Sequence, residues 1–173
     1  MRAPRRLFQK REGSSAVEFA MVAMPFFFMM FAIMELAFVF VLDSVLENAA
    51  IEAGRLVRTG QADKGGITAS QFKDRLCSRM SIFSADCASK TSVDVRVLTQ
   101  FRNVNPPDPM QSGAFKEDGL TYVTGQPGSL VLIRAWYRHT LFTPFLQQGL
   151  SRTGNGQAVL TATTAFRNEP YDS

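Results

Sequence analysis

The hydrophobic pattern divides the chain near residue 60. From Phe19 to Met34 the chain runs for 16 residues without a charged side chain, Glu35 interrupts it, and apolar residues continue to Leu42. Farther along, apolar residues recur at spacings of three and four, which is typical of an amphipathic helix. The pattern therefore predicts one long helix over residues 14–60, apolar all round in its first half and on one side in its second.

The first half of this helix is long enough to cross a membrane. Residues 19–42 would extend about 36 Å at about 1.5 Å per residue, whereas the hydrocarbon core is about 30 Å thick. Glu35 then has two interpretations. It marks the outer interface of a short span, or it lies within the bilayer, where a charge usually has a partner or a function. Its position near the end of the apolar run favours the interface.

The net charge of +4 is concentrated in front of the apolar run. Residues 1–13 carry five basic side chains and one acidic one, and the rest of the chain carries 14 of each sign. This is the positive-inside pattern, which predicts a cytoplasmic leader and a periplasmic remainder. No basic patch is left for nucleic-acid binding. A secretory signal peptide is the rival interpretation, but there the small residues follow the apolar run, and here they precede it.

The remainder, residues 61–173, has the pattern of an α+β domain. Residues 67–80 predict one short helix after a polar linker over 61–66. Three segments rich in β-branched and aromatic residues predict an antiparallel sheet, namely 92–101, 129–140 and 157–168. The expected fold is thus a long N-terminal membrane-spanning helix packed on a small antiparallel sheet domain with one short extra helix.

Cys77 and Cys87 are the two cysteines, and both follow the apolar run. Cys77 falls near the end of the predicted short helix, and Cys87 in the loop after it. Disulfides persist outside the inner membrane, and closing a loop of this length contributes about 2–3 kcal/mol in the chain-entropy model. We expect a disulfide here, with two unrelated buried thiols as the alternative.

Candidate catalytic chemistry is sparse. His139 is the single histidine, which argues against a His-based metal site or catalytic triad. The chain contains no phosphate-binding loop, dinucleotide fingerprint or nucleophile elbow. We therefore expect no enzyme, no cofactor and no metal site. Arg134, Trp136 and Arg138 form a row on one predicted strand, and we interpret the row as a solvated face rather than a contact surface.

The order of parts at the start of the chain resembles type IV pilins and pseudopilins. A basic leader ends at Gly13, and Glu18 follows five residues later at the opening of the apolar helix. More specifically, the segments GSSAVEFAMVAMPFFFMMFAIMELAFVF and ENAAIEAGRLVRTG resemble the TadE-like family of the tight-adherence (Flp) pilus system. The resemblance covers about residues 11–60, and the closing AFRNEPY also looks like the tail of these proteins.

The resemblance implies cleavage by a prepilin peptidase between Gly13 and Ser14. Glycine suits a narrow protease cleft because it has no side chain. Glu18, which precedes Phe19, would become the fifth residue of the mature chain. In pilin-like assemblies this carboxylate meets the new N-terminal amine of a neighbour, and pairing would offset the cost of burying both charges. The alternative is a glutamate that is merely favoured by the helix dipole.

The resemblance also implies a function and partners. The chain would be a minor pseudopilin needed for assembly of a tight-adherence (Flp) pilus, single-pass in the bacterial inner membrane. Implied partners are the prepilin peptidase, a second, TadF-like pseudopilin, the Flp major pilin and the inner-membrane pilus assembly platform. The alternative function is an uncleaved signal-anchored protein whose periplasmic domain binds a ligand or a partner.

Overall fold

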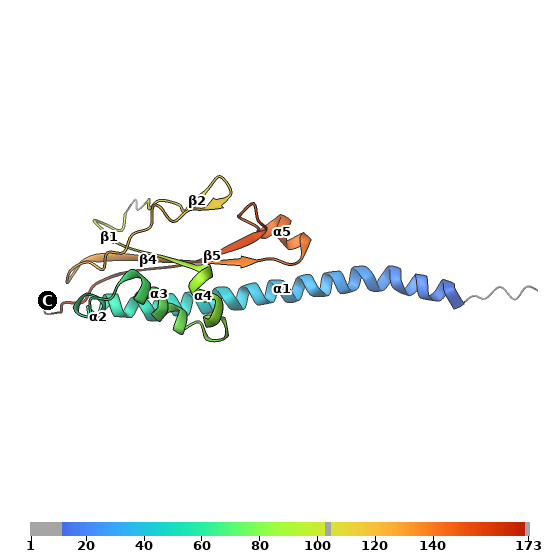
Figure 1. Ribbon diagram of the computed structural model, residues 1–173, viewed down its shortest axis with the longest axis horizontal. Coiled ribbons are helices and arrows are strands. Elements are labelled where there is room, and N and C mark those ends of the chain that lie inside the picture. Colours follow the sequence, from blue (N-terminus) through green and yellow to red (C-terminus); the bar gives the residue numbers. More distant parts are fainter. Residues whose placement is uncertain (1–11, 103–104, 172–173) are drawn as a thin grey trace, which may run out of the picture.

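A computed structural model describes residues 12–102 and 105–171 of the chain, so most of the predicted leader lies outside the described residues. Helix α1 runs beside the sheet in its second half and projects well beyond it in its first half (Figure 1). In chain order the elements are α1 (Glu12–Arg58), α2 (Gln61–Lys64), α3 (Ala69–Ser78), the 3-10 helix η1 (Ser81–Phe83), α4 (Ser84–Lys90), β1 (Thr91–Leu98), β2 (Met110–Gln111), β3 (Ala114–Phe115), β4 (Leu130–Thr140), α5 (Pro144–Leu150) and β5 (Gln157–Arg167).

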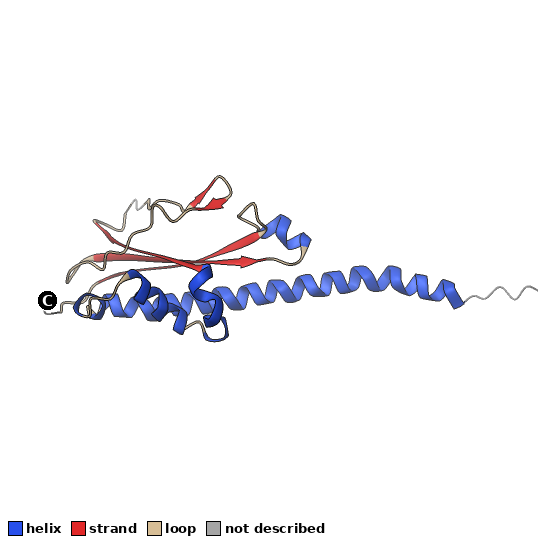
Figure 2. Ribbon diagram, viewed as in Figure 1, coloured by secondary structure: helices blue, strands red, loops and turns tan. Residues whose placement is uncertain are grey.

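The main sheet is antiparallel, with strand order β1-β4-β5, and α1 and α3 lie on the same side of it (Figure 2). The α+β prediction is confirmed, and each of the three predicted strands is present. The helical content differs from the expectation of one extra helix. The linker over 61–66 contains α2, and Cys87 lies in α4 rather than in a loop. Short helices of one or two turns carry too little periodicity to be read from a sequence.

The core forms where the second half of α1 crosses the sheet. Its buried stripe is made of Leu42, Leu46, Ala49, Ala50, Ala53 and Val57. It packs on the side chains of β4 that point the same way, which are Val131, Ile133, Ala135 and Tyr137. The alanines let the helix come close to the strands. A Cβ at Gly54 would lie 3.2 Å from the ring of Phe166, so the glycine serves this close approach.

The C-terminal tail closes the end of α1. Gly60 has a φ of 74°, and a Cβ there would lie 2.5 Å from the ring of Tyr171, so only glycine suits this position. The backbone N–H of Glu169 donates to the carbonyl of Arg58 at 2.9 Å, and their side chains form an exposed ion pair. The C-terminal tail therefore packs against the end of α1 as part of the folded domain.

The second face of the sheet is covered by the long connection between β1 and β4. Arg134 and Trp136 are only 7% and 4% exposed, so the prediction of a solvated row was wrong. The guanidinium of Arg134 stacks on the Trp136 ring at 4.8 Å, and Phe115 of β3 packs against the same ring. The connection carries four prolines and little regular structure, so the sequence pattern could not indicate that it folds back over the strand.

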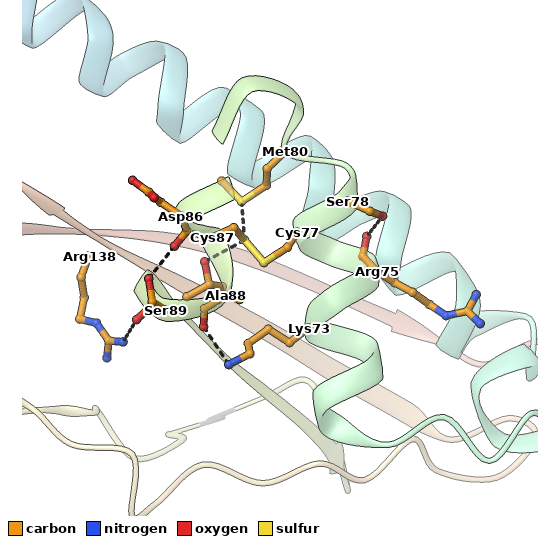
Figure 3. Close-up of a disulfide and its surroundings, with 11 residues drawn as sticks. Lys73, Arg75, Cys77, Ser78, Met80, Asp86, Cys87, Ala88, Ser89 and Arg138 are labelled. Atoms are coloured by element: carbon orange, nitrogen blue, oxygen red, sulfur yellow. Dashed lines mark hydrogen bonds between the residues drawn. A yellow bond between two sulfur atoms is a disulfide. The ribbon is translucent and has the colours of Figure 1, made fainter. Parts of the chain in front are cut away.

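Cys77 and Cys87 form the expected disulfide, which joins α3 to α4 (Figure 3). Met80 lies beside it, with its sulfur 3.2 Å from Sγ of Cys87. Two further contacts fix α4 in place: Lys73 donates to the carbonyl of Ala88, and Arg138 donates to the carbonyl of Ser89. The disulfide therefore sits at the junction of the short helices with the sheet.

Replacing both Cys77 and Cys87 by alanine should lower the free energy of unfolding by about 2–3 kcal/mol, because the bridge no longer restricts the unfolded chain. The measurement is denaturant unfolding of the full chain in detergent, with and without a reductant. Reductant should lower the stability of the wild type and leave the double variant unchanged. Equal stability of oxidised and reduced wild type would contradict this account.

Candidate functional site

The projecting half of α1 presents an apolar surface that the domain does not cover. Residues 15–58 form a helix that is long and apolar enough to cross a membrane, and only 17% of its most apolar stretch is buried. A core helix of a soluble domain would be mostly buried, so this half of α1 needs lipid or other helices around it. Its large exposed side chains include Val17, Phe19, Met21, Val22, Met24, Phe26, Phe31, Ile33, Met34 and Phe40.

The predicted processing and assembly residues lie at the far end of this surface. Gly13 and Ser14 are in the first turn of α1, and Glu18 and Phe19 are exposed one turn later. Along the helix axis, Glu18 lies about 26 Å from Glu35. Glu18 and Glu35 therefore belong to separate sites, one near the start of the helix and one where the domain begins.

Glu35 joins α1 to the connection between β4 and α5. One oxygen of its carboxylate accepts a hydrogen bond from the backbone N–H of Phe142, and the other accepts from the N–H of Thr143 at 2.8 Å. Thr143 is the N-cap of α5 and has an extended backbone. The N–H groups of Phe142 and Thr143 therefore take no part in the hydrogen bonds of the helix or of a strand pair. The carboxylate thus supplies both acceptors and holds this connection against the helix. The expectation that Glu35 marks the outer interface did not include this contact with Phe142, which lies 107 residues further along the chain.

His139 lies next to this contact. Its ring is buried between the rings of Phe38 and Phe142, with centroid distances of 5.4 and 6.4 Å. Burial lowers the pKa of His139, and the nearby Glu35 carboxylate only partly opposes this. A neutral, buried imidazole here fills the corner between strand and helix. Within residues 12–102 and 105–171, no three His, Cys, Asp or Glu side chains are grouped to hold a metal.

A second carboxylate, Asp94 of β1, organises the opposite face of the sheet. It is fully buried, and Arg134 donates to it from Nη2 at 2.8 Å and from Nε at 3.1 Å. Arg96 donates two more hydrogen bonds, at 2.6 and 2.8 Å, and the N–H of Thr121 donates at 2.9 Å. Burial alone would raise the pKa of Asp94, but these donors together hold it below its ordinary value. Because Thr121 belongs to the connection and Arg134 also donates to the carbonyl of Pro107, the cluster locks the connection onto the sheet.

The sequence analysis assigned no role to Asp94 and so missed this cluster. The available signal was the strand register, in which Asp94 lies directly opposite Arg134. Opposite charges in directly paired positions stabilise a sheet, but the register itself is not visible in a single sequence. The burial of the pair depends on the connection that covers it.

Comparison with known proteins bears on the first helix alone. The family model described as TadE-like protein matches residues 13–55, about a quarter of the chain. The match begins at the predicted processing glycine and contains Glu18, Glu35 and most of the stripe that packs on the sheet. The resemblance to this family is therefore confirmed over α1. No curated protein and no solved structure matches the chain.

Asp94→Asn should lower the free energy of unfolding by about 3–5 kcal/mol, because it leaves the buried guanidinium of Arg134 and the half-buried one of Arg96 without their anion. The control is Glu169→Gln, which removes the exposed ion pair with Arg58 and should change stability by about 0–1 kcal/mol. Denaturant unfolding of the full chain measures both. Similar effects of the two variants would show that the buried cluster is not a major source of stability.

The same cluster predicts a pH dependence. Because the folded pKa of Asp94 is lowered, its stabilisation is fully present above the unfolded value of about 3.9 and is lost as the pH falls toward the folded value. Acid unfolding of Asp94→Asn should accordingly show a shallower dependence on pH than that of the wild type below about pH 4.

Glu35→Ala should speed amide hydrogen exchange at Phe142 and Thr143 about ten- to a hundredfold, since hydrogen bonds to a charged acceptor are worth about 1.5–3 kcal/mol. Glu35→Gln keeps one carbonyl acceptor and should have a smaller effect. Glu47→Ala, at an exposed position farther along α1, is the control and should leave both amides unchanged. Unchanged exchange in Glu35→Ala would rule out the contact.

Proposed function

We propose that this chain is a minor pseudopilin needed for assembly of a tight-adherence (Flp) type IV pilus, cleaved after Gly13 and assembled through α1. The observation that carries the proposal is the coincidence of the TadE-like match with a projecting, exposed and apolar half-helix. A surface of this kind is stable only in lipid or among other helices. A pilin-like subunit needs both environments, one before assembly and one after it.

The architecture supports this role because one continuous helix serves both parts of the molecule. Residues 12–58 form α1 without a break, and the second half of α1 is the core of the folded domain. When the projecting half is pulled or moved, the domain therefore moves with it, because the two are joined by one helix and its packed side chains and not by a linker. This suits a subunit that is drawn out of a membrane by its helix.

Cleavage after Gly13 would act at the first turn of α1. A protease cleft takes an extended backbone, and terminal turns of helices fray at little cost. The product would begin with a free amine at Ser14, four residues before Glu18. Residues four apart lie on the same helix face, so the amine and the carboxylate would be neighbours on one chain and available to a neighbouring helix together.

The proposed orientation follows from the charge pattern. The basic residues before Gly13 would hold the leader in the cytoplasm, with residues 61–173 in the periplasm. The partners that this role requires are the prepilin peptidase, a TadF-like pseudopilin, the Flp major pilin and the assembly platform of the inner membrane. None of them needs a catalytic group from this chain.

Mass spectrometry of membrane-extracted protein should find the mature N-terminus at Ser14. Gly13→Leu should block cleavage and piliation together, because the side chain obstructs the protease cleft. Glu18→Ala should leave cleavage intact and abolish piliation, whereas the control Glu47→Ala should affect neither. Electron microscopy or shear-and-blot assays of pili provide the second readout.

The possible outcomes separate the parts of this proposal. An intact leader in cells with an active peptidase would overturn it and favour the uncleaved, signal-anchored protein. Normal piliation by Glu18→Ala would leave the cleavage site standing and remove the charge-pairing role of this carboxylate.

A further inference from the structure

The end of the domain that carries α5 lies alongside the apolar half of α1. The side chains of the two helices enclose a groove of about 370 Å³, lined by Phe28, Met29, Ala32, Ile33 and Leu36 of α1 and by Phe145 and Leu146 of α5. Every lining residue is apolar. In Figure 1, α5 is the element that follows β4 at the end of the sheet toward the projecting half of α1. The domain therefore reaches down to residues that sequence reasoning assigned to the membrane.

The depth of this contact follows from helix geometry. If α1 enters the hydrocarbon at Phe19, Phe28 lies about 14 Å along its axis and Leu36 about 26 Å. The hydrocarbon core is about 30 Å thick. The part of α1 that faces α5 therefore falls in the outer half of the core, and α5 cannot be wholly in water while α1 spans the membrane.

The composition of the segment from Leu141 to Leu150 suits that depth. Its sequence, LFTPFLQQGL, contains no charged side chain. Phe142 and Phe145 are 79% and 65% exposed. Phe145 adjoins the uncovered apolar side chains of α1, so it extends one contiguous apolar patch. The side-chain amide of Gln147 donates one hydrogen bond to the carbonyl of Leu141, within the same segment.

Glu35 lowers the cost of placing this segment beside lipid. Backbone N–H groups without partners and a lone carboxylate are each costly in hydrocarbon. Here the carboxylate of Glu35 accepts from the N–H groups of Phe142 and Thr143, so each offsets part of the cost of the other. The contact also fixes the segment at the level of Glu35 on α1.

We propose that residues 141–150 insert into the outer leaflet of the bilayer as a second membrane-contacting element, with Phe142 and Phe145 in contact with acyl chains. The partner is the lipid itself. The apolar surface of the segment is continuous with that of α1, and lipid is the solvent that the rest of this surface already requires. The inference goes beyond the proposed function but rests on its assumption that α1 spans a membrane.

Depth-dependent fluorescence quenching tests this insertion in the full-length protein reconstituted into phosphatidylcholine vesicles. Both native cysteines are held in the disulfide, so one introduced cysteine gives a single labelling site. The test variant is Phe145→Cys, with Phe142→Cys as a second position. Each carries an environment-sensitive fluorophore and is exposed to nitroxide-bearing lipids and, separately, to aqueous iodide.

Two control variants calibrate the measurement. Met24→Cys reports on α1 within the candidate span. Phe101→Cys is the matched control, because it is a phenylalanine with 54% exposure just beyond β1, at the end of the sheet opposite to α5. The expected result is loss of fluorescence with nitroxide lipids at residues 24, 142 and 145 but not at 101, and quenching by iodide at 101 alone.

Three other results would overturn the proposal, each in a distinguishable way. Quenching by iodide at 142 and 145, with lipid quenching kept at 24, would place the segment in water and leave the membrane anchor intact. Iodide quenching at residue 24 would remove the anchor itself and with it the proposed function. Protection of residue 145 from both quenchers, lost when protein is diluted in lipid, would identify a second copy of this chain as the occupant.

Discussion

The burial of the second half of α1 against the sheet is the interaction on which the rest of the structure depends. Leu42, Leu46 and Val57 are almost fully buried there, and the alanines between them let the helix lie close to the strands. Because the same helix continues without interruption into the apolar half, this packing also determines where the domain stands relative to a membrane. The contact of the C-terminal tail with Gly60 and Arg58 closes the far end of the same interface.

Two carboxylates, the buried Asp94 and the half-buried Glu35, hold the remaining parts against this frame. Asp94 binds the long connection to one face of the sheet, and Glu35 binds the start of α5 to α1. Asp94 is removed from water, and several donors offset the cost of its burial. The donors are mostly guanidinium groups at Asp94 and two backbone N–H groups at Glu35.

Whether a feature could be predicted from the sequence depends on how far apart in the chain its interacting residues lie. The long helix, the three strands and the antiparallel order were predictable because periodicity and turn residues are local. The disulfide was predictable because its cysteines are close in sequence and their compartment could be inferred. The burial of Arg134 and Trp136 was not predictable, since the segment that covers them has no regular pattern. The contact between Glu35 and Thr143 joins residues 108 positions apart, and no periodicity reports such a contact.

The methionines of the apolar half indicate how one surface can serve two environments. Six of the eight methionines lie in the first 34 residues, and Met21, Met24 and Met34 are exposed on α1. Methionine is unbranched and adapts to irregular neighbours, so the same side chain can pack against acyl chains and against another helix. In the proposed role, α1 loses its contacts with acyl chains and gains contacts with other helices during assembly. Withdrawal of the segment around Phe145 from lipid would accompany that step, which couples the domain to the exit of its own helix from the membrane.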